Sequence, residues 1–282
     1  MKKNRYRYRH IWFWFVRVWF PLILLIGLPT FISLQVSGNL SRAEVQRIAN
    51  TNPLTRAIYE TFSGNTVGII VILWGISFVA IWIIIRKISE KRVFNDGKFI
   101  KLDWCFRQLW VANKIIGFKK ITMLGVSLPL QFKIYSEGVF EEKIIENSDS
   151  VMESFAGNIN VDISKVGQGD ELNLLICDTY DILDRQIAEK YKSNPAVKIH
   201  PEGGFKANKR YDNAKLSAEV RKIVLQYCEV YSTVNLFLTT NPLNTKRIVD
   251  SSFSANDRTG FEAVFVVQMG DNRIYDKRYR IY

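Results

Sequence analysis

The stretch Val67–Ile85 limits what this chain can fold into more than any other part of the sequence. It contains no charged residue and no proline, and the basic pair Arg86-Lys87 follows it directly. About 20 apolar residues at ~1.5 Å rise per residue match a hydrocarbon core of about 30 Å. A buried helix of this length in a globular protein would normally show a polar stripe. The stretch therefore predicts a transmembrane helix.

A second apolar run, Ile11–Gln35, precedes it. Arg17 lies among tryptophans near the start of this run, as in an interfacial aromatic belt where a long cation reaches headgroups. The alternative is a secretory signal peptide, but the run is long, contains Pro21 and Pro29, and lacks a small-residue cleavage site. We therefore expect a membrane module over residues 1–97, with spans at about 11–35 and 67–85. Within the connection at 36–66, a short helix is expected to begin at Ser41.

The basic residues indicate how these spans are oriented. Met1–His10 holds five Lys or Arg and no acid, and Arg86–Arg92 is a second basic cluster, whereas the connection carries only Arg42, Arg47 and Arg56. The positive-inside rule then places both termini in the cytoplasm of a multi-pass protein, expected in a bacterial inner membrane. Much of the net charge of +12 flanks these spans. Lipid headgroups are thus the expected partners of these cations, and direct DNA binding is not expected.

Residues 98–282 are predicted to form a cytosolic α/β domain with a partly parallel sheet. Buried strands are expected at Leu172–Cys177, Val197–His200 and Val234–Leu238, with a helix at Ala214–Tyr227 between the last two. A helical turn at Asn244–Asp250 and a hairpin formed by Phe261–Gln268 and Arg273–Tyr282 complete this pattern.

The first part of this domain is less regular. Apolar residues at helical spacing, from Leu102 to Trp110, predict a juxtamembrane helix. Leu128–Tyr135 alternates between apolar and polar residues, which predicts a strand. Val139–Ile163 is expected to hold a helix and then a short strand.

Several kinds of chemistry are not indicated. The dinucleotide fingerprint, the P-loop, the zinc-protease motif and the GxSxG elbow are all missing from the sequence. Cys105, Cys177 and Cys228 have no metal-ligand spacing, and the two histidines are His10 and His200. We therefore expect reduced thiols, no cofactor, no metal and no catalytic residues, as in a binding protein rather than an enzyme.

The informative pattern is a repeated one. Two predicted buried strands, Leu172–Cys177 and Val234–Leu238, each run into a short polar loop. In open α/β sheets ligands bind beyond the carboxyl ends of strands, where hydroxyls and free amides suit phosphate or ribose oxygens. The candidate ligand-binding residues are these loops and nearby cations: Asp178, Thr179, Tyr180, Thr239, Thr240, Asn241, Lys206, Lys209, Arg210, Lys246 and Arg247. The alternative is that Thr and Asn cap helices or turns there, with the cations solvated.

Residues 171–282 resemble the latter part of a SAVED domain. The resemblance lies in LNLLICDTYDI at Leu172–Ile182, VNLFLTTNPLNTKRI at Val234–Ile248, and FVVQ at Phe265–Gln268. This sequence has Ile248-Val-Asp250 where that family usually has a glycine after its Pro-loop helix. The resemblance implies a Rossmann/CARF-like fold that binds a cyclic oligonucleotide made during phage infection.

SAVED domains belong to CBASS immunity, and one effector class is similar to this chain in joining two transmembrane helices to SAVED. The resemblance thus implies an effector that oligomerises on binding its messenger and disrupts the inner membrane. A second resemblance competes, because the basic leader, the two spans and the segment Leu128–Ile163 look like the front of FtsK-type conjugative coupling proteins. That kinship would imply a motor-less, ligand-free structural component of a conjugation or secretion assembly.

Overall fold

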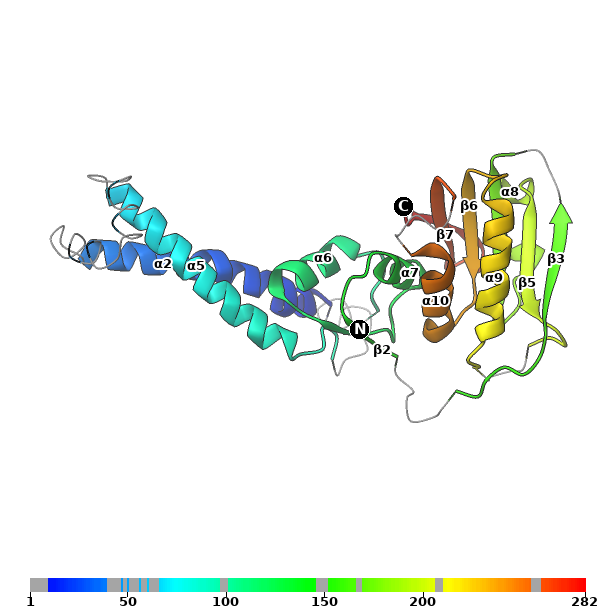
Figure 1. Ribbon diagram of the computed structural model, residues 1–282, viewed down its shortest axis with the longest axis horizontal. Coiled ribbons are helices and arrows are strands. Elements are labelled where there is room, and N and C mark those ends of the chain that lie inside the picture. The colour runs from blue at the N-terminus through cyan, green and yellow to red at the C-terminus, as the bar shows by residue number, and fades with distance from the viewer. Residues whose placement is uncertain are drawn as a thin grey trace. The chain divides into compact units, whose positions relative to one another are not determined.

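The protein, seen here as a computed structural model, forms two compact units (Figure 1). The structure describes residues 10–39, 66–96, 101–145, 152–165, 169–205, 210–254 and 260–282, with single positions 47, 50, 56 and 60. The membrane unit consists of Met1–Asp96 and Gln108–Lys120, and the sheet unit consists of Gly97–Arg107 and Ile121–Tyr282. The helix predicted from Ser41 lies outside the described residues.

The membrane unit contains two long apolar helices. The first combines η1 (Phe15–Trp19) with α2 (Phe20–Asn39), and the second is α5 (Thr66–Glu90). By length and composition, His10–Val36 and Ile70–Glu90 could each cross a membrane. The helices contact each other, and the Trp74 Nε1 donates to the Thr30 Oγ1 at 3.1 Å. Both predicted spans are therefore helices that pack as a hairpin.

The predicted juxtamembrane helix is confirmed and is slightly displaced along the chain. It consists of α6 (Phe106–Val111) and η2 (Ala112–Ile116), whereas Leu102 lies before it in an isolated bridge. The Trp82 Nε1 of α5 donates to the Ile115 carbonyl at 2.8 Å. Gly117 ends the helix at a φ of 94°, and a Cβ there would lie 2.9 Å from the Arg86 Cγ. The residues after η2 thus pack against the charged end of α5.

The sheet unit is built on a six-stranded sheet in the order β3-β5-β4-β6-β7-β8. The four central strands are parallel, and the two edge strands are antiparallel to their neighbours. This arrangement confirms an α/β domain with a partly parallel sheet. The strands are β3 (Ile159–Lys165), β4 (Glu171–Ile176), β5 (Ala196–Pro201), β6 (Thr233–Leu238), β7 (Ala263–Met269) and β8 (Tyr275–Arg280). A smaller sheet pairs β1 (Lys120–Thr122) with β2 (Glu142–Ile144).

Both faces of the central strands are buried. On one face, Leu175 and Phe237 pack with Tyr191 of the short helix α8 (Glu189–Lys192), which follows the 3-10 turn η3 (Asp184–Gln186). Side chains alternate along a strand, so the buried Leu174 and Leu236 point to the opposite face. Helices α9 (Ala214–Tyr227) and α10 (Pro242–Ile248) lie side by side over one face in Figure 1, and η4 (Val249–Phe253) continues α10. Because both faces of the sheet are covered, the sequences of β4 and β6 are almost continuously apolar.

The prediction of a strand at Leu128–Tyr135 is wrong, because this segment is helix α7 (Leu128–Ser136). Its first turn contains Pro129, a position that favours helix initiation and suits no central strand. Gln131, which lies opposite the apolar face in the alternating pattern, is 5% exposed and donates from Nε2 to the Val126 carbonyl at 2.8 Å. A helix buried almost all round carries apolar residues at every spacing, so alternation there does not distinguish helix from strand.

The helix predicted within Val139–Ile163 is also wrong for the described part of that segment. The described residues form β2 and the start of β3. The remaining predicted strands, helix α9 and the terminal hairpin are confirmed with shifts of one or two residues at their ends.

Candidate functional site

The structure brings together the two polar loops that follow β4 and β6. These strands are parallel neighbours, with Ile176 opposite Leu238, so both chains leave the sheet at the same edge. Thr239 then joins the loops, because its Oγ1 accepts from the Asp178 amide at 3.0 Å and donates to the Tyr180 carbonyl at 2.8 Å. We call residues 178–180 and 239–241, with the groups that contact them, the strand-end site.

Asparagine side chains tie this site to the starts of two helices. Asn241 caps α10, and its Oδ1 accepts from the Asn244 amide at 2.9 Å. The Asn244 Nδ2 donates to the Asp178 Oδ2 at 2.8 Å and to the Tyr211 carbonyl at 2.9 Å. The Asn244 Oδ1 accepts from the amide of Asn213, which caps α9. One buried side chain therefore links three separate segments of the chain.

Asp178 is the charged member of this network. Burial raises the pKa of its carboxyl above the usual value, and hydrogen bonds from Asn244 and Asn241 oppose that rise. The donors are amides, which stabilise a carboxylate without adding a positive charge. Asp178 is thus positioned to hold the loops in place.

Three other predicted residues of the site are buried and have partners within it. Thr239, Thr240 and Asn241 are between 1% and 7% exposed. The hydroxyls of Thr240 and Thr245 lie 2.7 Å apart, and the Thr245 hydroxyl also donates to the Asn241 carbonyl. The capping role considered from the sequence therefore describes how these residues are used in the fold. Contacts to a ligand would come from the more exposed groups around them.

The other predicted residues that the structure describes are more exposed, and the acidic partners of two cations among them lie outside the two loops. An Arg247 guanidinium nitrogen lies 2.7 Å from the Asp212 Oδ2, and the Lys246 ammonium lies 3.5 Å from Asp250. Arg210 is exposed, and Tyr180 is 50% exposed. The predicted Lys206 and Lys209 lie outside the described residues.

Sequence reasoning missed several residues of the strand-end site. Asn213 and Asn244 are central to it, and Tyr211 and Asp212 contribute a carbonyl and a carboxylate. Asn213 had a local signal, because it directly precedes the predicted helix Ala214–Tyr227 and is a favoured N-cap. Asn244 had none, since its partners at positions 178, 211 and 213 are brought to it only by the tertiary fold.

A second polar cluster lies at the opposite ends of the same strands. The Glu171 carboxylate accepts from the Asn235 Nδ2 at 2.9 Å and from Arg278 at 3.0 Å, and the Asn173 Oδ1 also accepts from Asn235. Burial alone would raise the pKa of Glu171, but the hydrogen bonds from Asn235 and Arg278 outweigh it and hold this pKa below its usual value. This cluster fastens β8 to the first residue of β4.

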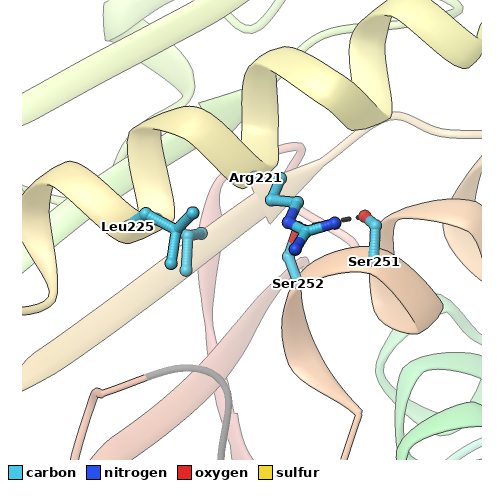
Figure 2. A pocket seen from close by; sticks show the side chains of 5 residues that line it. Arg221, Leu225, Ser251 and Ser252 are labelled. Carbon is cyan, nitrogen blue, oxygen red and sulfur yellow. Dashed lines mark hydrogen bonds between the residues drawn. The ribbon is translucent and has the colours of Figure 1, made fainter.

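A cavity of about 150 Å³ lies between α9 and η4 (Figure 2). It is lined by Arg221, Val224, Leu225, Ser251 and Ser252. The two serine hydroxyls lie 3.0 Å apart, and the Ser251 Oγ donates to the Ile248 carbonyl at 3.2 Å. Both hydroxyl hydrogens thus have acceptors within η4 and α10, and Arg221 supplies the charge of this cavity.

Comparison with solved structures finds a partial likeness to a receptor from Acinetobacter baumannii. The SAVED/CARF-domain containing receptor Cap4, solved with the cyclic trinucleotides 2′3′3′-cAAA and 3′3′3′-cAAA, is 11% and 12% identical to this chain. The matches cover 61% and 62% of this chain, each with a TM-score of 0.43. They cover 40% and 42% of the Cap4 chains, so this chain spans about two fifths of that receptor. No curated protein matches this chain.

A family model matches nearly the whole chain, over residues 2–282. Its description is the SMODS- and Ubiquitin system-associated 2TM effector domain. The two transmembrane segments of that description correspond to the two apolar helices of the membrane unit. The match confirms the predicted class of two-span effector and assigns the chain to the membrane. The chain belongs to the SMODS- and Ubiquitin system-associated 2TM effector family.

Proposed function

We propose that this protein is a membrane-anchored effector of CBASS antiphage defence that binds a cyclic oligonucleotide at the strand-end site. Binding would make the chain oligomerise, and the clustered hairpins would then disrupt the inner membrane. The family assignment supports the effector role, and the resemblance of residues 171–282 to SAVED supports the class of ligand. The observation that carries the proposal is the meeting of two polar loops at the carboxyl ends of β4 and β6, where open α/β sheets bind their ligands.

The strand-end site has the groups that a cyclic oligonucleotide needs. Arg210, Lys246 and Arg247, which follow or precede the segments of the site in the chain, would offer positive charge to the phosphates, and the Thr179 hydroxyl lies in the same loop as the half-exposed Tyr180. The network around Asp178 and Asn244 fixes these loops before any ligand arrives. A preorganised site lowers the entropic cost of binding.

The coupling to the membrane would follow from linkage. A ligand that binds the associated state more tightly than the monomer shifts the equilibrium toward association. In the proposed topology both termini are cytoplasmic, so the sheet unit meets a cytosolic messenger while α2 and α5 contact lipid. The protein would thus act as a sensor and effector in one chain, without catalysis.

Binding to the full-length protein tests this proposal. The chain is reconstituted in lipid nanodiscs and titrated with a panel of cyclic di- and trinucleotides. We expect at least one member of the panel to bind, and Lys246→Gln to weaken that binding about tenfold, equivalent to about 1.4 kcal/mol. Lys222→Gln on α9 is the matched control, because this lysine is 71% exposed and pairs with Glu219 away from the loops. Unchanged binding by Lys246→Gln would remove that residue from the site.

Release of a dye from liposomes tests the proposed output. Liposomes that carry the full-length protein should leak when the bound cyclic nucleotide is added, and chemical crosslinking should show larger assemblies at the same time. Failure of every cyclic nucleotide to bind would overturn the sensor role. Binding without leakage or association would overturn the proposed output and leave the sensor role standing.

A further inference from the structure

Two tyrosines at the strand-end site, Tyr180 and Tyr211, are fixed by the same loop. The Tyr180 carbonyl accepts from the Thr239 hydroxyl at 2.8 Å. The Tyr211 carbonyl accepts from the Nδ2 atoms of Asn241 and Asn244 at 3.0 and 2.9 Å. These bonds use the backbone of each tyrosine and do not involve either ring. The segment 239–244 thus fixes the backbone of both tyrosines.

The rings themselves retain accessible surface. Tyr180 is 50% exposed, and Tyr211 is partly exposed. A tyrosine has two side-chain torsions, so ordering its ring against a ligand costs little entropy. An exposed ring on a fixed backbone is therefore a suitable binding surface.

Phe155 supports the ring of Tyr211 from the side. The two rings meet edge to face, with centroids 5.8 Å apart. The Phe155 amide donates to the Asp212 carbonyl at 2.9 Å, so this contact is fixed through the residue next to Tyr211. Phe155 also lies against Gly157, where an added Cβ would come within 2.6 Å of the ring. The Tyr211 ring consequently packs against a phenylalanine ring whose own position is fixed.

We propose that Tyr180 and Tyr211 bind nucleobases of the ligand by stacking, while Arg210, Lys246 and Arg247 contact its phosphates. This inference rests on the proposed function and adds which residues contact the bases. Bases stack on aromatic side chains for about 1–3 kcal/mol each, with tolerance for different bases because every base has a π-face. Phosphate contacts by Lys and Arg are sensitive to salt. A site with both kinds of group binds a purine or pyrimidine nucleotide better than it binds a phosphate alone.

Aromatic substitutions in the full-length protein test this assignment. The probe is the cyclic nucleotide of the panel that binds the wild-type protein in nanodiscs most tightly. We expect Tyr180→Ala and Tyr211→Ala each to weaken binding about tenfold or more, and Tyr180→Phe and Tyr211→Phe to stay within about threefold, because stacking needs the ring and not the hydroxyl. Tyr227→Ala is the matched control, since this tyrosine lies at the other end of α9 and contacts Tyr231.

Salt dependence separates stacking from a general loss of the site. The ratio of wild-type to alanine-variant affinity should stay constant between about 50 and 300 mM salt, whereas the affinity of each protein should fall. Equal binding by wild-type protein and both alanine variants would refute the stacking role and leave the proposed function intact. A comparable loss in both phenylalanine variants would also refute it. Absence of binding by the wild-type protein would overturn the proposed function, and this inference with it.

Discussion

At the scale of single residues, the strand-end site is organised by amide side chains. Asn213 and Asn241 cap helices, and Asn244 connects both caps to Asp178. An asparagine side chain has two donor hydrogens and one acceptor oxygen, so a single residue can satisfy three polar groups at once. Such a network is stable when it is complete, because each buried group that loses its partner is costly.

Asn244→Ala should therefore destabilise the fold strongly. The substitution leaves the Asp178 carboxylate, the Tyr211 carbonyl and the Asn213 amide each short of a partner. We expect the free energy of unfolding to fall by about 2–4 kcal/mol. Thermal unfolding of the full-length protein in detergent measures the change. The exposed Asn160 provides the control, and Asn160→Ala should change stability by less than about 0.5 kcal/mol. Equal melting temperatures for the two variants would contradict the structural role of Asn244.

The raised pKa of Asp178 predicts how the contribution of this residue to the free energy of unfolding changes with pH. A carboxyl whose pKa is higher in the folded than in the unfolded chain favours folding when protonated. Its contribution becomes less favourable as pH rises from the unfolded value, about 3.9, through the folded value. Asp178→Asn keeps an oxygen acceptor for Asn244 and removes this titration.

The stability of Asp178→Asn relative to the wild-type protein should consequently increase from pH 4 to pH 7. Melting temperatures of both proteins at each pH measure this difference. A relative stability that decreases over the same range would show that the pKa of Asp178 is lowered in the folded protein and not raised.

At the scale of elements, α7 is the informative case. Its sequence alternates as a strand would, yet Gln131 is buried and Phe132 packs edge to face on Phe253 of η4 at 5.3 Å. In a strand with one solvated face, position 131 would tolerate a charge. In the buried helix it should not, because a charge without a partner is costly to bury.

Gln131→Lys distinguishes these two arrangements. We expect a loss of several kcal/mol, seen as poor expression or a much lower melting temperature of the full-length protein. Gln226→Lys on the exposed side of α9 is the matched control and should melt with the wild-type protein. A tolerated lysine at position 131 would indicate that Leu128–Ser136 is not a buried helix.

At the scale of the whole molecule, two units with different surfaces share one chain. The membrane unit exposes apolar side chains such as Ile23, Phe31 and Ile76. The sheet unit buries its apolar side chains on both faces of the sheet. An exposed apolar surface of this kind suits lipid, and a doubly covered sheet suits water.

The proposed topology predicts the behaviour of fusions to the full-length chain. Green fluorescent protein fused after Tyr282 should fluoresce in bacterial cells, and alkaline phosphatase fused there should be inactive, because this topology places both termini in the cytoplasm. Phosphatase inserted in the connection at 36–66 should be active. The reverse pattern would overturn the orientation and with it the access of a cytosolic messenger to the strand-end site.

Much of the architecture follows from the sequence alone. Uninterrupted apolar runs predict the two spans, and apolar strands alternating with the amphipathic helix at Ala214–Tyr227 predict a partly parallel sheet. These signals are strong because each comes from many residues that face the same environment. The meeting of residues 178–180 with 239–241 does not follow from the sequence, because only the structure shows that β4 and β6, which β5 separates along the chain, are neighbours in the sheet.

Only the tertiary structure decided how the strand-end residues are used. Thr239 and Asn241 are candidate ligand contacts in the sequence, and in the fold they are buried and hydrogen-bonded within the loops. Asn244 and Tyr211 gain their roles from partners more than thirty residues away. A polar side chain has the same local sequence signal whether it binds a ligand or another loop, because burial and partners depend on the packing of distant segments.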